Sequence, residues 1–125
     1  MEKQNIIATR NEDKGGNRVK CIFESEDKQL TFEITEEIDE NTTEELRRKI
    51  DHEITRYMPR KAIFDFDCVS FMDSAGIGLI LGRYKMMRRV GGEMYLSNVN
   101  KNVRKLLEMS GITKIIPITE KISME

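Results

Sequence analysis

The 125-residue chain has no tryptophan, two prolines, two cysteines and a single histidine. Zinc sites need three or four convergent ligands, and the chain has no Cys-x-x-Cys pair, so we expect His52 to be a solvated surface residue and no metal to be bound. Cys21 and Cys68 both lie in or beside apolar segments. We expect two reduced, partly buried thiols, because disulfides are rare in cytosolic proteins.

Long hydrophobic runs and an excess of one charge are missing as well. No apolar stretch approaches the roughly 20 residues that span a bilayer, and the first residues lack the layout of a signal peptide. We therefore expect a cytoplasmic protein without a membrane partner. The 21 basic and 22 acidic residues leave a net charge of −1, which argues against direct nucleic-acid binding. With 38% hydrophobic and 34% charged residues, the chain can form one compact domain.

The polar residues 1–17 are predicted to form a flexible leader, and residues 18–125 the folded domain. Two strand-like segments come first, at 19–24 and 30–35, and the polar residues between them indicate a hairpin. Helical and strand-like segments then alternate. They are a helix that opens with a capping-box sequence at 41–44 and runs to Tyr57, a strand at 61–67, a helix at 74–90, a strand at 93–97, a helix at 100–110 and a short strand at 115–118.

This order of segments predicts an α/β fold in a single domain. The sheet should be small and mixed, with an N-terminal antiparallel hairpin followed by parallel strands, and the helices should pack on it. Residues 119–125 are the expected start of a last helix. The helix at 74–90 should turn five side chains toward the sheet: Ile77, Ile80, Leu81, Tyr84 and Met87.

The segment Met72-Asp73-Ser74-Ala75-Gly76-Ile77-Gly78 joins the strand at 61–67 to the helix at 74–90. Ser74 should lie at a helix N-terminus, where backbone N–H groups are unpaired, the dipole is positive and a phosphate is tolerated. Two interpretations stay open: Ser74 is a plain N-cap that competes with Asp73, or another protein modifies it. Catalysis would need a base beside Ser74, and the sole histidine, His52, lies on another helix, so we expect no catalytic residue.

Three glycines follow Ser74, at positions 76, 78 and 82, and each costs a helix about 1 kcal/mol relative to alanine. Either the helix packs closely on its own sheet or a partner approaches its first turns. The third glycine comes one residue late for the dinucleotide-binding pattern Gly-x-Gly-x-x-Gly, so we expect no cofactor. A basic run on the same helix is typical of a solvated face, with an acidic partner as the alternative: Arg83, Lys85, Arg88 and Arg89.

The stretch Ser70-Phe71-Met72-Asp73-Ser74-Ala75-Gly76-Ile77-Gly78, continued to Lys85, resembles bacterial anti-sigma factor antagonists of the STAS domain family, and most closely their sporulation form. Segments 91–94 and 109–116 continue the resemblance, which covers about residues 19–118. Two positions depart from the pattern. Glu36 stands where the family has Gly, and Ala75 stands where the sporulation form has Ser.

The resemblance implies a regulatory binding module without catalytic activity. In this family the serine after the Asp, here Ser74, is phosphorylated by an ATP-bound anti-sigma factor that is also a serine kinase. The unphosphorylated antagonist binds that kinase and frees the sigma factor, and a serine phosphatase resets the phosphorylated form. Asp39, in the turn before the first helix, is implied in kinase docking. The alternative is a STAS scaffold subunit of a stress-signalling assembly.

Five residues are the expected partner contacts: Asp39, Asp73, Ala75, Gly76 and Ile77. Asp39 should lie near Ser74, because both follow strands that end at the same edge of the sheet. Phosphorylation adds about −1.5 to −2 charges. Next to Asp73, that charge would repel an acidic partner surface without unfolding the domain.

Overall fold

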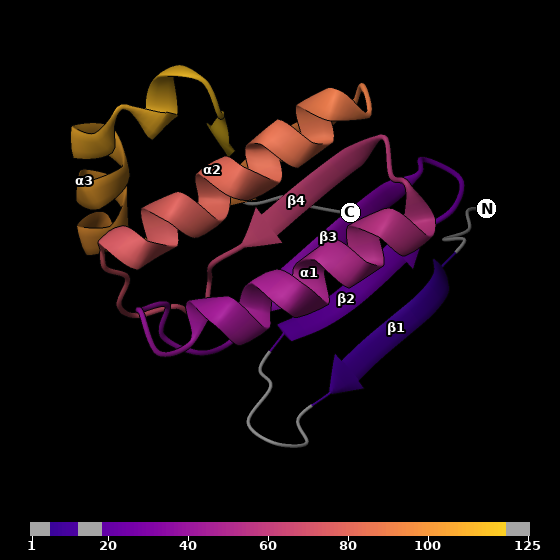
Figure 1. Ribbon diagram of the computed structural model, residues 1–125, viewed down its shortest axis with the longest axis horizontal. Helices are drawn as coiled ribbons and strands as arrows, with labels where there is room; N and C mark the ends of the chain where they lie inside the picture. Colours follow the sequence, from indigo (N-terminus) through magenta and orange to yellow (C-terminus); the bar gives the residue numbers. More distant parts are fainter. Residues whose placement is uncertain (1–5, 13–18, 120–125) are drawn as a thin grey trace.

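A computed structural model describes residues 6–12 and 19–119. One mixed sheet has the strand order β1-β2-β3-β4-β5-β6. Figure 1 labels its strands β1 to β4. Strands β1, β2 and β3 pair antiparallel, and β3 to β6 pair parallel. This arrangement confirms the predicted α/β fold. The strands are β1 (Ile6–Glu12), β2 (Val19–Glu24), β3 (Gln29–Ile34), β4 (Lys61–Asp65), β5 (Glu93–Ser97) and β6 (Ile118–Thr119).

Helices α1 (Thr43–Tyr57) and α2 (Ser74–Arg89) lie side by side on one face of the sheet, and α3 (Lys101–Ser110) lies beside α2 (Figure 1). A 3-10 turn, η2 (Ile112–Lys114), follows α3. Because α1, α2 and α3 each come directly after a parallel strand, their N-termini gather at one edge of the sheet. This edge carries the segments in which the sequence places Asp39 and Ser74.

Alternating residues of the hairpin strands form the floor of the core. Leu30, Phe32 and Ile34 of β3 are each at most 1% exposed. Phe32 stacks on Phe64 of the neighbouring strand β4, with ring centroids 4.9 Å apart. Helix α1 covers this floor because its apolar residues recur at helical spacing, and Leu46, Ile50 and Ile54 are all buried.

The prediction of a leader at 1–17 is wrong for Ile6–Glu12, which form the edge strand β1 and pair antiparallel with β2. Its apolar residues Ile6, Ile7 and Ala8 are consecutive, so the segment lacks the alternation that marks a half-buried strand, and its place in the sheet comes from pairing with β2. Residues 1–5 and 13–18 lie outside the described residues, as does most of the helix predicted at 119–125. The division of the chain at residue 18 stays a prediction.

The last strand is also shifted from its prediction. Ile115 and Ile116 belong to the turn after η2, and pairing with β5 begins only at Ile118. Pro117 explains the shift, because it lacks the N–H that a ladder needs, and its carbonyl instead accepts a hydrogen bond from Leu96 N at 3.0 Å.

Helix α2 is rotated relative to the predicted face. Its buried residues are Gly76, Leu79, Ile80, Arg83 and Met87, whereas Ile77, Leu81 and Tyr84 are only partly buried. Gly76 lets α2 approach the side chains of Met72 and Ile38 closely. The burial of Arg83 also moves the buried face of the helix away from the predicted residues. The interpretation of the basic run as a solvated face is therefore wrong for Arg83, although Lys85, Arg88 and Arg89 are exposed.

Candidate functional site

Two segments are joined through their backbones at the edge of the sheet where the helix N-termini gather. Ile38, after β3, and Met72, before α2, form an isolated parallel bridge. Ile38 N donates to Phe71 O at 3.1 Å, and Asp73 N donates to Ile38 O at 3.1 Å. Both bridge residues are buried. The segment that carries Asp39 therefore lies directly against the segment that carries Ser74, as the sequence predicts.

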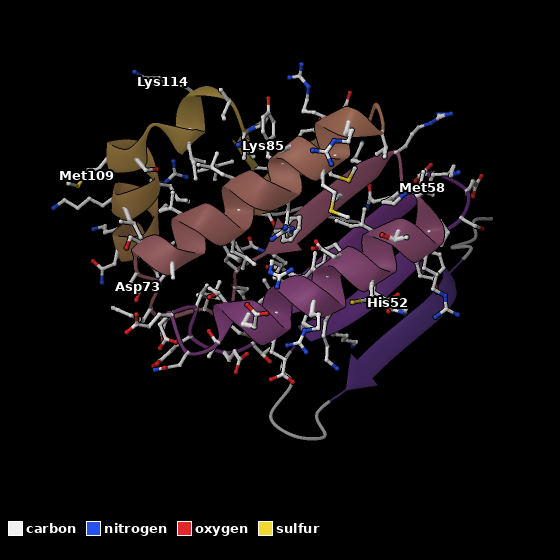
Figure 2. The ribbon with its side chains drawn as sticks, in the orientation of Figure 1. His52, Met58, Asp73, Lys85, Met109 and Lys114 are labelled. Carbon is white, nitrogen blue, oxygen red and sulfur yellow. The ribbon has the colours of Figure 1, made fainter. Side chains whose placement is uncertain are left out.

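Ser74 is the first residue of α2 and is exposed. The N-cap is Asp73, whose carboxylate accepts a hydrogen bond from Ala75 N at 2.8 Å. The hydroxyl of Ser74 makes no hydrogen bond to any other residue that the structure describes. The interpretation of Ser74 as a plain N-cap is thus wrong, because Asp73 performs that task and leaves the Ser74 hydroxyl available to an incoming enzyme. In Figure 2, Asp73 marks this end of α2.

Asp39 has a local structural task. Its Oδ1 accepts hydrogen bonds from Asn41 N at 2.9 Å and Thr42 N at 3.2 Å, which is the pattern of a carboxylate that closes a turn. Thr42 is the N-cap position of α1, but its hydroxyl accepts no hydrogen bond from the helix. It donates to Glu37 O at 2.9 Å and accepts from Asp39 N at 3.0 Å. The predicted capping box is absent here. The polar side chains order the turn before the helix.

The three glycines of α2 have different surroundings. A Cβ at Gly76 would overlap the side chain of Met72 and come within 3.1 Å of Ile38 Cγ2, so Gly76 is required for packing against the bridge residues. A Cβ at Gly78 or Gly82 would meet no atom within 4 Å. Close packing within the domain therefore explains Gly76 and leaves the other two unexplained.

Gly78 lies on an open groove of about 260 Å³ between the N-terminal halves of α1 and α2. The walls combine small and charged residues: Thr43, Glu44, Arg47, Ala75, Gly78, Leu79 and Arg83. Ser74 is one helical turn from Gly78, and side chains four residues apart share one face of a helix. The groove therefore continues the exposed surface on which the Ser74 hydroxyl lies.

An ion pair closes the floor of the groove. Arg83 Nε lies 2.8 Å from Asp51 Oδ1, and Arg83 also donates through Nη1 to Leu79 O at 3.2 Å. Burial raises the pKa of the Asp51 carboxyl, against the opposing effects of Arg83 and Arg47. Burial likewise lowers the pKa of the Arg83 guanidinium, against the effect of Asp51. The pair links α1 to α2 through the side chains of Asp51 and Arg83.

The two segments that meet at the Ile38–Met72 bridge are acidic. Residues 36–45 and 66–75 contain eight Asp and Glu residues and no Lys or Arg: Glu36, Glu37, Asp39, Glu40, Glu44, Glu45, Asp67 and Asp73. His52 lies on α1, well away from Asp73 (Figure 2). Within 6–12 and 19–119, the structure shows no cluster of His, Cys, Asp and Glu suited to a metal ion.

The two cysteines differ in environment. Cys21 is buried in β2, whereas Cys68 is exposed, so the prediction of two partly buried thiols is wrong for Cys68. Neither cysteine forms a disulfide within the described residues. In the described part of the chain, no helix combines the length and the apolar character needed to cross a bilayer.

Sequence comparison finds two anti-sigma factor antagonists similar to part of this chain. The anti-sigma F factor antagonist of Paenibacillus polymyxa is 56% identical over 50 residues, which make up 40% of this chain and 43% of that protein. The anti-sigma-B factor antagonist of Bacillus subtilis (strain 168) is 38% identical over 53 residues, 42% and 49% of the respective chains. The chain thus spans about half the length of the curated relatives it matches.

Solved structures extend the similarity over more of the chain. The anti-sigma factor antagonist SpoIIAA in its unphosphorylated form superposes with a TM-score of 0.59 at 26% identity, over 78% of this chain and 83% of that one. The Bacillus cell fate determinant SpoIIAA in its phosphorylated form gives 0.62 at 29% identity, over 78% and 86%. Murine Slc26a9, an anion transporter, covers 97% of this chain and 21% of its own at 14% identity and a TM-score of 0.69, and shares the fold alone.

The family assignment rests on most of the chain. Residues 22–124 match the STAS domain, from strand β2 to the end of the sequence. This range includes the bridge between Ile38 and Met72, the Asp73 cap and the exposed Ser74. Sequence, fold and site therefore agree that the chain belongs to the STAS domain family.

Proposed function

We propose that this protein is an anti-sigma factor antagonist that is controlled by phosphorylation of Ser74. The unphosphorylated form binds an anti-sigma factor serine kinase in its ATP-bound state and releases the sigma factor. Phosphorylation stops this binding, and a serine phosphatase restores it. The observation that carries the proposal is the geometry at the start of α2: Asp73 caps the helix, and the Ser74 hydroxyl is exposed and unbonded within the described residues.

Docking would use the edge of the sheet around Ser74. The backbone bridge brings Asp39 and Ser74 to one surface, and Asp73, Ala75 and Ile77 are all partly exposed there. Gly76 differs from these, because it is buried against Met72 and shapes the surface from beneath. We assign Gly76 to support of the contact and keep Asp39, Asp73, Ala75 and Ile77 as partner-binding residues.

The switch is local. A phosphate on the first residue of α2 is compatible with the helix dipole, so the fold persists after phosphorylation. The added group takes up space on the surface that the kinase would cover, and it adds charge beside Asp73 and Asp39. Binding to the kinase therefore decreases because the contact surface changes, while the core under the bridge stays packed.

The names of the relatives give this role its biological setting. The curated relatives include both an anti-sigma F and an anti-sigma-B factor antagonist. The higher identity is with the anti-sigma F antagonist, 56% against 38%, and on that basis we propose control of sporulation transcription in the cytoplasm. A scaffold subunit of a stress-signalling assembly is the alternative.

A reconstituted release assay tests the proposal. The purified protein, in its unphosphorylated and phosphorylated forms, would be added to a complex of the kinase and its sigma factor with ATP analogues present. Only the unphosphorylated form should displace the sigma factor. Assembly of the protein alone into a particle of megadalton mass, measured by light scattering, would instead favour the scaffold role.

A further inference from the structure

The amide of Asn100 connects the segment before Ser74 to helix α3. Asn100 is the N-cap of α3, and its Oδ1 accepts a hydrogen bond from Val103 N at 2.8 Å. Its Nδ2 donates to Val69 O at 3.2 Å, across 31 residues of sequence. The two contacts use the acceptor and the donor of one amide, so they fix its orientation and leave neither end free to rotate.

Val69 lies in the middle of the segment that leads from β4 to Ser74. Its side chain is 1% exposed, and its N–H donates to Phe66 O at 2.9 Å. Phe66 N in turn donates to Ser97 O of β5 at 2.9 Å. The segment before Ser74 is therefore held from two sides: the Ile38 bridge fixes Phe71 and Asp73, and the β5–α3 connection fixes Phe66 and Val69.

We propose that Asn100 is a positioning residue for Ser74: its side chain holds the Val69 carbonyl and so keeps the phosphoacceptor segment in the conformation that the kinase accepts. This proposal rests on the proposed function, since it concerns the same serine. An exposed hydroxyl on a loosely held segment would spend only part of its time in a reactive position, and effective phosphate transfer depends on near-attack geometry. Because the Asn100 side chain bonds to Val69 O and Val103 N and not to Ser74, it acts through the backbone.

The two roles of Asn100 can be separated by substitution. Asn100→Asp and Asn100→Ser both keep a good N-cap acceptor for Val103 N. Neither can donate to Val69 O: an ionised carboxylate has no donor, and the serine side chain is shorter. Asn102→Asp is the matched control, because it adds the same charge two residues further along α3. Asn102 is exposed, and its side chain makes no hydrogen bond to another described residue.

Amide hydrogen exchange on the isolated protein is the first measurement. In Asn100→Asp and Asn100→Ser, exchange in residues 66–74 should rise, while the amides of α3 should stay near their wild-type values. The melting temperature should fall by only about 2–6 °C, because one hydrogen bond is lost. Asn102→Asp should match the wild type throughout. Unchanged exchange in 66–74 for both Asn100 variants would overturn the proposal without any reference to a kinase.

Phosphorylation of Ser74 by the purified anti-sigma kinase with ATP is the second measurement. Both Asn100 variants should show a kcat/KM lowered by about two- to tenfold, the range that corresponds to one ordinary hydrogen bond. Equal rates for wild type and both variants would overturn the positioning role and leave the proposed function intact. No phosphate on the wild type would instead overturn the proposed function, so the two failures are distinguishable.

Discussion

Ile38 and Met72 face each other in an isolated parallel bridge, and this contact brings two separate parts of the sequence into one surface. Each residue is directly followed by an acid, Asp39 in one segment and Asp73 in the other. Both acids accept hydrogen bonds from backbone N–H groups near the start of a helix. The exposed hydroxyl of Ser74 thus lies on an edge that the bridge holds together, and a change of charge or size at Ser74 alters that surface directly.

Substitution of Ser74 should affect binding and leave the fold almost unchanged. Ser74→Ala should alter the free energy of unfolding by less than about 0.5 kcal/mol, because Asp73 supplies the cap. It should bind the kinase persistently, whereas Ser74→Asp should bind weakly. Ser74→Asn has nearly the same size as the Asp variant without its charge. Calorimetry with all three separates bulk from charge, and equal affinities for Ala and Asp would remove the switch.

Loss of the Asp73 carboxylate, unlike a change at Ser74, should also lower the stability of the fold. Asp73→Ala removes the acceptor for Ala75 N and should cost about 0.5–2 kcal/mol, measured by urea unfolding. Asp73→Ser retains a capping oxygen and should recover most of that stability. If Asp73→Ala left the free energy of unfolding unchanged, the cap would have to come from Ser74, and the hydroxyl would not be free.

For Asp39, a substitution by alanine would change two properties at once. The carboxylate closes the turn at Asn41 and Thr42, so Asp39→Ala should lower stability as well as kinase affinity. Asp39→Asn keeps an acceptor oxygen and removes only the charge. If Asp39 takes part in docking, the Asn variant should melt near the wild-type temperature and still bind the kinase less tightly. Wild-type affinity in the Asn variant would make Asp39 a purely structural residue.

The glycines of α2 should respond with opposite signs to alanine. Gly76→Ala should destabilise the protein by about 1–3 kcal/mol, because the new methyl overlaps Met72. Gly78→Ala meets no atom within 4 Å and should stabilise the helix by up to about 1 kcal/mol. If the kinase covers the groove, Gly78→Ala should also reduce affinity, with Gly82→Ala as the more distant control. Wild-type affinity for Gly78→Ala would place the groove outside the contact.

The ion pair between Arg83 and Asp51 gives a pH-dependent prediction. The pKa of Asp51 is raised by burial, so the folded protein holds a proton on this carboxyl that the unfolded chain releases. Between the raised value and the ordinary value of 3.8, the contribution of Asp51 to stability should therefore fall as pH rises. Comparison with Asp51→Asn by thermal unfolding isolates this contribution. An identical pH dependence in both proteins would contradict it.

The same pair should be costly to break from one side. Arg83→Met leaves Asp51 without its closest partner and should cost about 1–3 kcal/mol. The double variant Arg83→Met with Asp51→Leu should recover much of that loss, because no charge then remains to be desolvated. Chemical denaturation of the two single variants and the double variant measures the coupling. Strictly additive losses would show that the two residues do not interact.

The sequence predicted those features that repeat with a clear period or that carry a specific residue. Leu46, Ile50 and Ile54 gave α1 its buried face, and Gly91 and Gly111 both adopt the positive φ expected after a helix. The proximity of Asp39 to Ser74 followed from strand order alone. These features depend on local sequence or on the topology of parallel strands.

The features that were missed depend on contacts between distant residues. No local pattern distinguishes Arg83 from Arg88, five residues later on the same helix. Arg83 is buried and pairs with Asp51, whereas Arg88 is exposed. Strand β1 lacks an alternating apolar pattern, and its place in the sheet depends on its pairing with β2. Likewise, Asp73 and Ser74 are adjacent and both are good N-cap residues. The sequence therefore does not show which of them is the cap, because that depends on the backbone geometry.

The most direct measurement is a map of phosphate on the intact protein after incubation with the purified anti-sigma kinase and ATP. Peptide mass spectrometry should find one phosphate, on Ser74, and none on the exposed neighbour Ser70 or on Ser110, whose hydroxyl donates to Leu107 O at 2.8 Å. The Ser74→Ala variant should remain unmodified under the same conditions. Phosphate on another residue, with Ser74 untouched, would contradict the account.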